Sequence, residues 1–264
     1  MGHSQSWKMR GFASALLVMV SAVALAGCQS KTASLDSADG LSTGSLGNGS
    51  LSETAKLGDA FEADPKNAAK GLAYASGLES IGQTDRQLEI LKQLADGHPG
   101  DAKITAHYAK KLIGAGRGAE AIPILEQLVA APGADWRIYS ALGSAYDQDG
   151  KYEQARAQYS KALELKPDAM SVLNNLGMSY ALQGDLKQAE ATLRKASQNP
   201  KANTEPRIQQ NLALVVGLQG RFDEAREIAG KNLPPDQVEA NMAYLQKMLS
   251  QSNTWQQLSD GTQG

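Results

Sequence analysis

Residues 136–169 read WRIYSALGSAYDQDGKYEQARAQYSKALELKPDA, and this stretch decides the fold. Tyr139, Leu142 and Tyr146 recur at helical spacing, so they predict one apolar stripe on a first helix. Gly150 follows that stripe and suits a turn, where a residue with positive φ is often needed. The stretch therefore predicts two helices joined as a hairpin.

Small residues and a proline complete this hairpin. Gly143 and Ala155 have little or no side chain, which lets the two helices approach closely. Pro167 ends the second helix, since proline cannot continue a hydrogen-bonded turn.

The same residue types recur every 34 positions along the chain. The columns are Tyr74, Tyr108, Leu142 and Leu176; Leu78, Leu112, Tyr146 and Tyr180; and Gly82, Gly116, Gly150 and Gly184. This period, with an aromatic residue, Leu-Gly, Tyr, Ala, an aromatic residue and Pro in order, resembles the tetratricopeptide repeat. The resemblance implies an all-α superhelical solenoid, whose stacked hairpins form a binding surface and not a catalytic pocket.

Five copies of the repeat are predicted between two capping helices. The first four copies are residues 67–100, 101–135, 136–169 and 170–203. A fifth follows a slip of two positions and is visible as Leu212, Ala213, Val216, Gly220, Ala225 and Ala229. Residues 53–64 keep the register of a second helix and are expected to cover the first repeat. The apolar stripe Val238, Met242, Leu245 and Leu249 predicts one amphipathic helix as the other cap. The solenoid is expected over residues 52–249, followed by a tail over residues 250–264.

The amino-terminal residues 1–27 have the form of a cleaved secretory signal. Lys8 and Arg10 form a short positive region, and an uncharged apolar run follows from Phe12 to Leu25. That run is shorter than the roughly 20 apolar residues that a membrane span needs.

Cys28, the only cysteine, ends the sequence Leu25-Ala26-Gly27-Cys28, which resembles the lipobox of bacterial lipoproteins. The resemblance implies cleavage before Cys28 and lipidation of its thiol and amino group, with Gln29 implying export to the outer membrane. Several acyl chains anchor stably, because each buried methylene contributes roughly 0.8 kcal/mol. The alternative is an ordinary signal peptide with a chance cysteine.

A tether is expected between the anchor and the solenoid, over residues 28–51. Its Ser, Gly, Thr and Asp residues cannot bury an apolar core. A flexible chain of this length typically spans about 25 Å.

Charge argues against nucleic acid as a partner. The chain holds 26 Lys and Arg against 28 Asp and Glu, and removal of Lys8 and Arg10 leaves 24 minus 28, a net charge of −4. Nucleic-acid binding needs a concentrated basic face.

No motif predicts an enzyme, a metal site or a cofactor. His98 and His107 have no second ligand at zinc spacing. Residues 114–118, GAGRG, lack the Lys-Ser/Thr of a phosphate-binding loop and fall where each repeat has its inter-helix turn. An enzyme with an unrecognised site remains the least favoured class, and a buried pair of titratable groups in a cleft would favour it.

A protein-binding face is expected on the first helices of the repeats. In tetratricopeptide proteins the second, fifth, sixth, ninth and twelfth positions of the first helix line the concave side. Those positions give Lys103, His107 and Lys110; Arg137, Ser144 and Asp147; Asn174, Asn175 and Met178; and Arg207 and Asn211. The Asn and Arg members suit an extended backbone or a carboxylate, and the alternative is a solvated face with no single ligand.

The carboxy-terminal region carries a narrower resemblance. Residues 211–249 read NLALVVGLQGRFDEAREIAGKNLPPDQVEANMAYLQKML, and they are similar to the end of the TadD family, tetratricopeptide lipoproteins of the tight-adherence (Flp) pilus system. The matching residues are Leu233, Pro234 and Pro235, then Asn241, Tyr244 and Leu245.

This resemblance implies a non-enzymatic assembly factor for a type IVb pilus, lipid-anchored on the periplasmic side of the outer membrane. Its expected partners are the pilus secretin or other pilus assembly components, with no small-molecule substrate. The alternative is a general envelope adaptor that serves the barrel-assembly or peptidoglycan machinery.

Overall fold

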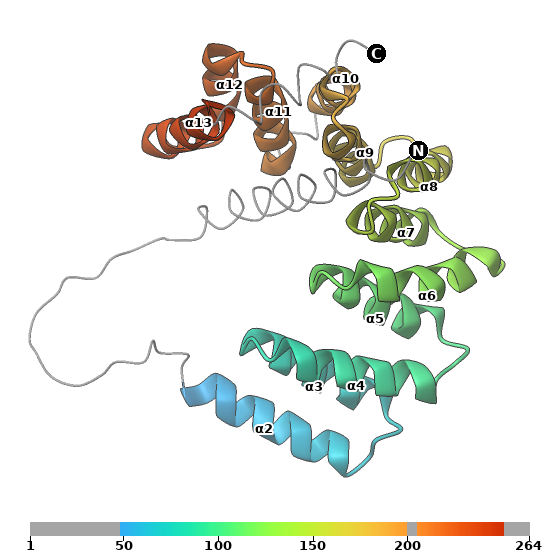
Figure 1. The fold of residues 1–264 in the computed structure, drawn as a ribbon. Helices are drawn as coiled ribbons and strands as arrows, with labels where there is room; N and C mark the ends of the chain where they lie inside the picture. Colours follow the sequence, from blue (N-terminus) through green and yellow to red (C-terminus); the bar gives the residue numbers. More distant parts are fainter. Residues whose placement is uncertain (1–47, 200–204, 251–264) are drawn as a thin grey trace, which may run out of the picture. The chain divides into compact units, whose positions relative to one another are not determined.

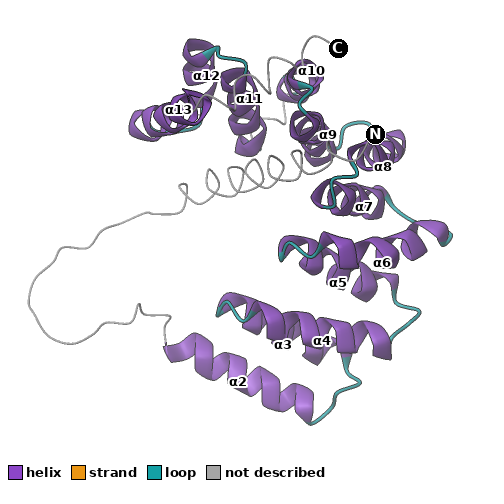
Figure 2. Ribbon diagram, viewed as in Figure 1, coloured by secondary structure: helices purple, strands orange, loops and turns teal. Residues whose placement is uncertain are grey.

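The computed structural model describes residues 48–199 and 205–250, and these residues form an all-helical fold. This part of the chain forms twelve helices. Figure 2 shows them joined by loops. The predicted fold class is therefore confirmed. The predicted signal (1–27), Cys28, most of the tether and nearly all of the tail lie outside the described residues.

The helices fall into two compact units. The amino-terminal unit holds α2 (Asn48–Glu62), α3 (Ala68–Ser80), α4 (Thr84–Gly97), α5 (Ala102–Gly114) and α6 (Gly118–Ala130). The carboxy-terminal unit holds α7 (Trp136–Gln148), α8 (Tyr152–Leu165), α9 (Met170–Gln183), α10 (Leu186–Ser197), α11 (Pro206–Leu218), α12 (Phe222–Ala229) and α13 (Pro235–Ser250). Figure 1 labels these helices along the chain.

Each predicted repeat is a hairpin of two neighbouring helices. The pairs are α3 with α4, α5 with α6, α7 with α8, α9 with α10, and α11 with α12. Asp101 and Asp135 begin α5 and α7, because each side chain accepts hydrogen bonds from two backbone amides of the first turn.

The turn inside each hairpin uses a glycine with positive φ. Gly150 has φ 74°, and the amide of Lys151 donates to the carbonyl of Tyr146 at 2.9 Å, which closes the end of α7. Gly82, Gly116, Gly184 and Gly220 repeat this conformation. The turn between α5 and α6 thus falls within residues 114–118, as predicted.

Close helix contact in the third repeat depends on Gly143. A Cβ added there would lie 2.6 Å from the ring of Tyr159 on α8, which is closer than real Cβ contacts allow. Tyr159 is 1% exposed, and Ala155 beside it is fully buried. The predicted role of these small residues is confirmed.

The two terminal helices cover the ends of their units. α2 packs on α3, where the rings of Phe61 and Tyr74 lie 6.2 Å apart. It begins at Asn48, so residues 48–51, expected in the tether, are helical. In α13 the predicted stripe Val238, Met242, Leu245 and Leu249 is buried.

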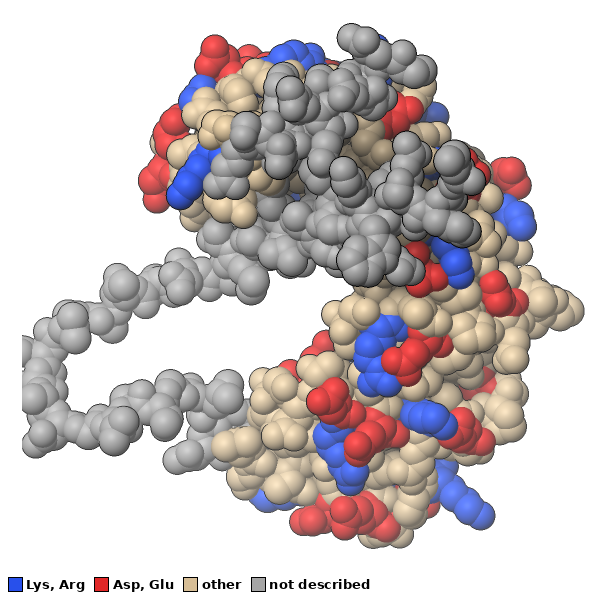
Figure 3. Space-filling model, viewed as in Figure 1, with Lys and Arg blue, Asp and Glu red and all other residues tan. Residues whose placement is uncertain are grey.

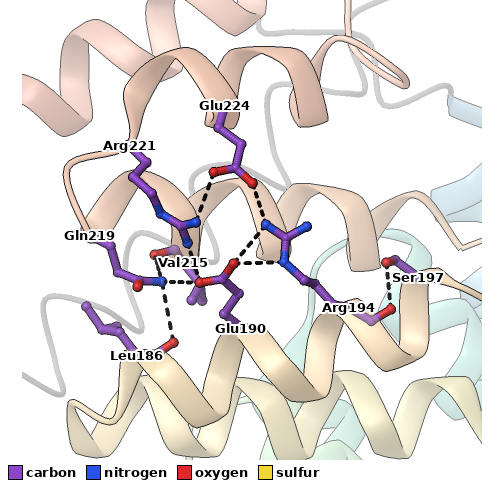
Figure 4. Close-up of polar contacts among 8 residues, drawn as sticks. All are labelled: Leu186, Glu190, Arg194, Ser197, Val215, Gln219, Arg221 and Glu224. Carbon is purple, nitrogen blue, oxygen red and sulfur yellow. Dashed lines mark hydrogen bonds and ion pairs between the residues drawn. The ribbon is translucent and has the colours of Figure 1, made fainter.

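A ring of ion pairs joins α10 to the last hairpin (Figure 4). Arg194 pairs with Glu190 at 2.8 Å and with Glu224, while Arg221 pairs with Glu224 at 3.0 Å and with Glu190. Gln219 also donates to Glu190 at 2.8 Å. Burial would raise the pKa of Glu190, but hydrogen bonds from Gln219, Arg194 and Arg221 outweigh it and lower the pKa.

Candidate protein-binding faces

The predicted face residues lie on the first helices of their hairpins, as expected. Lys103, His107 and Lys110 are on α5 of the amino-terminal unit. The others are on α7, α9 and α11 of the carboxy-terminal unit: Arg137, Ser144, Asp147, Asn174, Asn175, Met178, Arg207 and Asn211.

Four polar side chains connect three successive first helices of the carboxy-terminal unit. Asn211 on α11 donates its amide to the carbonyl oxygen of Asn174 on α9 at 2.8 Å. Asn175 on α9 donates to the hydroxyl of Ser144 on α7 at 3.4 Å. All four side chains are partly exposed. We call this set, Ser144, Asn174, Asn175 and Asn211, the amide stripe.

Asp147 and Met178 lie inside the helix packing and not on the surface. Both are 8% exposed. The carboxylate of Asp147 accepts hydrogen bonds from the Tyr159 hydroxyl at 2.8 Å and from the Ser179 hydroxyl at 2.6 Å, and so links α7 to α8 and α9. A ligand on the amide stripe would therefore meet Asp147 only through other side chains.

The ionisation of Asp147 is shifted by this environment. Burial raises the pKa of Asp147 to about 7, although the hydrogen bonds from Ser179 and Tyr159 and the charge of Arg156 act in the opposite direction. Burial and the nearby Asp147 carboxylate also raise the pKa of Tyr159. Asp147 and Tyr159 form a buried titratable pair, and neither is among the residues that line the pocket beside Leu214 or the groove beside His107.

The two predicted arginines are both exposed, and Arg137 already has local partners. Its guanidinium pairs with Asp135 at 3.0 Å and stacks over the ring of Trp136 at 4.7 Å. Arg207 lies in the first turn of α11, the same helix as Asn211.

In the amino-terminal unit, His107 and Lys110 line a polar groove. Lys111, Glu79, Gln87 and Thr84 are among its other lining residues. Lys111 pairs with Glu79 and lowers its pKa, while partial burial and the neighbouring lysines lower the pKa of His107. Lys103 is exposed on the same helix but does not line this groove.

His98 has a structural position. Its Nδ1 lies 2.9 Å from the carbonyl oxygen of Leu94, and its Nε2 lies 3.1 Å from that of Lys66. The ring thus ties the end of α4 to the loop before α3. Within residues 48–199 and 205–250, no three His, Cys, Asp or Glu side chains gather as metal ligands would.

An apolar pocket in the carboxy-terminal unit was not predicted. It is lined by Ala213, Leu214 and Gln210 of α11, and by Leu233, Asn241, Tyr244 and Leu245, among others. Tyr244 is 57% exposed there. Its signal in the sequence is the Leu-Pro-Pro and Asn-x-x-Tyr-Leu motif, because four of the motif residues line the pocket.

Charges on the visible surface are mixed. On the face in Figure 3, Lys and Arg lie among Asp and Glu over the described helices. Several charged residues of the described helices form ion pairs, such as Arg86 with Glu89 and Arg117 with Glu120. In the described part of the chain, no helix has both the length and the apolar character that crossing a bilayer requires.

Comparison with known proteins agrees with this architecture. Models of the tetratricopeptide repeat match residues 80–145, 143–184, 171–200 and 206–231. The chain therefore belongs to the tetratricopeptide-repeat proteins.

Individual relatives match it less completely. The uncharacterized protein y4yS of Sinorhizobium fredii is 27% identical over 111 residues, which cover 42% of this chain and 60% of the relative. The photosystem I assembly protein Ycf3 of Prochlorococcus marinus is 30% identical over 112 residues, covering 36% of this chain and 63% of the relative. The chain thus spans less than two thirds of these relatives.

A solved structure extends the match across more of the fold. The crystal structure of PilW, described as a widely conserved type IV pilus biogenesis factor, aligns with a TM-score of 0.59 at 22% identity. The alignment covers 77% of this chain and 92% of PilW. At this identity the likeness shows the fold alone.

Proposed function

We propose that this chain is an outer-membrane tetratricopeptide lipoprotein that serves as a scaffold in assembly of the tight-adherence (Flp, type IVb) pilus, through the pilus secretin. Its role as a protein-interaction scaffold follows from the repeat family and the helical fold. The pilus assignment is supported by the carboxy-terminal motif and by the shared fold with a pilus biogenesis factor. The lipid anchor is supported by the lipobox that ends at Cys28.

The observation that carries the binding role is the amide stripe. Asn side chains offer both donors and acceptors, and an extended peptide has one N–H and one C=O in each residue. Positions on α7, α9 and α11 therefore suit contact with several successive residues of one partner segment. Arg207, on α11 with Asn211, adds a cation for a carboxylate on that segment.

The test is site-specific photo-cross-linking in native envelopes. A photoreactive residue replaces Asn174 or Arg207, and in separate strains it replaces Lys161, which is exposed on the second helix α8. We expect the first two positions to capture the secretin or another pilus component, and the Lys161 position to capture much less.

Other outcomes separate the alternatives. Capture of barrel-assembly or cell-wall proteins at Asn174 and Arg207 would replace the pilus assignment with a general envelope adaptor. Equal capture at all three positions would remove the amide stripe from the binding role.

A further inference from the structure

A chain of hydrogen bonds runs from the buried Asp147 to the amide stripe. The hydroxyl of Tyr159 donates to Oδ2 of Asp147 at 2.8 Å, and the same hydroxyl lies 3.2 Å from Oγ of Ser144. Ser144 in turn accepts from Nδ2 of Asn175 at 3.4 Å. A buried carboxylate on α7 is thus linked through α8 to a predicted ligand contact on α9.

The direction of this chain follows from its buried end. An ionised carboxylate can only accept, and the Tyr159 hydroxyl has one hydrogen to give. Since Tyr159 gives it to Asp147, its oxygen can only accept from Ser144, and the Ser144 oxygen then accepts from Asn175. The charge on Asp147 therefore turns the NH₂ group of Asn175 toward Ser144.

This direction fixes which groups the stripe offers to a ligand. With its NH₂ group toward Ser144, Asn175 keeps its carbonyl oxygen for a partner. Asn174 has the opposite orientation, because its carbonyl oxygen accepts a hydrogen bond from Asn211. Its NH₂ group is therefore the group that it offers to a ligand. Two adjacent residues of α9 thus present an acceptor and a donor, which match the N–H and C=O of an extended backbone.

We propose that Asp147 is a positioning residue that sets the donor and acceptor pattern of the amide stripe through Tyr159 and Ser144, and that its protonation reverses the Asn175 amide. A protonated Asp147 can donate to Tyr159, Tyr159 to Ser144, and Ser144 to the carbonyl oxygen of Asn175. One covalent bond forms, the O–H bond of the Asp147 carboxyl, with a proton taken from a hydronium ion of the solvent, and all other changes are in hydrogen bonds. The proposal rests on the proposed binding role of the stripe.

The surroundings of Asp147 place its protonation, and with it the reversal of the Asn175 amide, close to neutral pH. Tyr152, Arg156 and Tyr159 face it from α8, and Ser179 faces it from α9. Burial raises the pKa of Asp147 to about 7 against the opposing hydrogen bonds and the Arg156 charge. The pattern of the stripe would then change close to neutral pH.

Nuclear magnetic resonance of the full chain, labelled at Asn nitrogen and Asp carboxyl carbon, tests the coupling without any ligand. We expect the side-chain amide signals of Asn175 to shift between pH 5 and 8 with the same midpoint as the Asp147 carboxyl signal. The Asn174 amide, bonded to Asn211, is the internal reference and should stay constant.

Two variants make the test decisive. Tyr159→Phe removes one hydroxyl, so Asp147 should still titrate while the Asn175 signals stop following it. In Asp147→Asn, the Asn175 amide signals should have the same chemical shifts at every pH, and these should equal the wild-type values at low pH. Asn175 signals that ignore the Asp147 titration, or that follow it equally in Tyr159→Phe, would overturn the proposal.

The outcome is separable from that of the proposed function. If Asn175 follows the Asp147 titration but cross-linking at the amide stripe fails, the proposed binding role is wrong and the coupling between the two residues still holds. If cross-linking succeeds but Asn175 does not follow the Asp147 titration, the scaffold function is supported and the positioning role of Asp147 is wrong.

Discussion

At the scale of single residues, the buried carboxylate of Asp147 makes stability depend on pH. Its pKa rises from 3.8 to about 7 on folding, so the unfolded chain ionises first as the pH increases. Below pH 3.8 both states are protonated, and above about 7 the penalty of the buried charge is constant. Between these values stability falls with rising pH, by on the order of 4 kcal/mol at most.

Asp147→Asn should remove this dependence. From pH 5 to pH 8 we expect the free energy of unfolding of the wild type to fall relative to that of the variant, because Asn carries no charge to bury. Urea unfolding at each pH measures it. A difference that stays constant over this range would contradict the assigned environment of Asp147.

Gly143 permits a second test at the same scale. Gly143→Ala should destabilise the carboxy-terminal unit by about 1–3 kcal/mol, because the new methyl group overlaps the Tyr159 ring. Gly114→Ala is the matched control, since Gly114 also lies in a helix but a Cβ added there would have no atom within 4 Å. Thermal unfolding compares them, and equal effects would show that contact with Tyr159 is not the cause.

At the scale of elements, the ion-pair ring should hold the last hairpin to α10. The Glu190 side chain is 15% exposed and faces two arginines, so Glu190→Gln leaves both without this partner. We expect a loss of about 1–2 kcal/mol, seen as faster amide hydrogen exchange in α11 and α12.

The matching control is Glu89→Gln, which breaks an exposed pair with Arg86. Such pairs typically contribute about 0–1 kcal/mol. Because folding lowers the pKa of Glu190, its contribution is present above pH 4.5 and lost as the pH falls toward the lowered value. Equal effects of the two substitutions would mean that the ring adds nothing beyond a surface pair.

At the scale of the whole molecule, the proposed lipid anchor makes the location of the protein in the cell envelope depend on one residue, Cys28. Cys28→Ala should remove the protein from the outer-membrane fraction and abolish pilus assembly, because no acyl chain can then be attached. Fractionation and pilus counts measure both effects. A Cys28→Ala protein that stays in the outer membrane and supports pili would refute the lipid anchor.

The repeat hairpins could be predicted because their signals are local. Gly150 and its equivalents mark the turns, and the stripe of Val238 and Leu245 marks the last helix, each within a few residues of sequence. The start of α2 was misplaced, since Asn48 to Leu51 have the polar and small residues typical of a tether. Tertiary packing on α3 stabilises that helix beyond its local propensity.

The amino-acid sequence was enough to predict the repeat period, the all-helical class and the helices that carry the candidate face, because a 34-residue repeat of small, aromatic and glycine positions is typical of one kind of hairpin. It placed Asp147 on that face by register. The folded structure was needed to show that Asp147 is buried against Tyr159 and Ser179, and that Asn174 and Asn175 are held in opposite orientations. These facts depend on contacts between residues about 12 to 37 positions apart in the chain, and repeat register fixes a residue's helix but not the partners that neighbouring repeats bring to it.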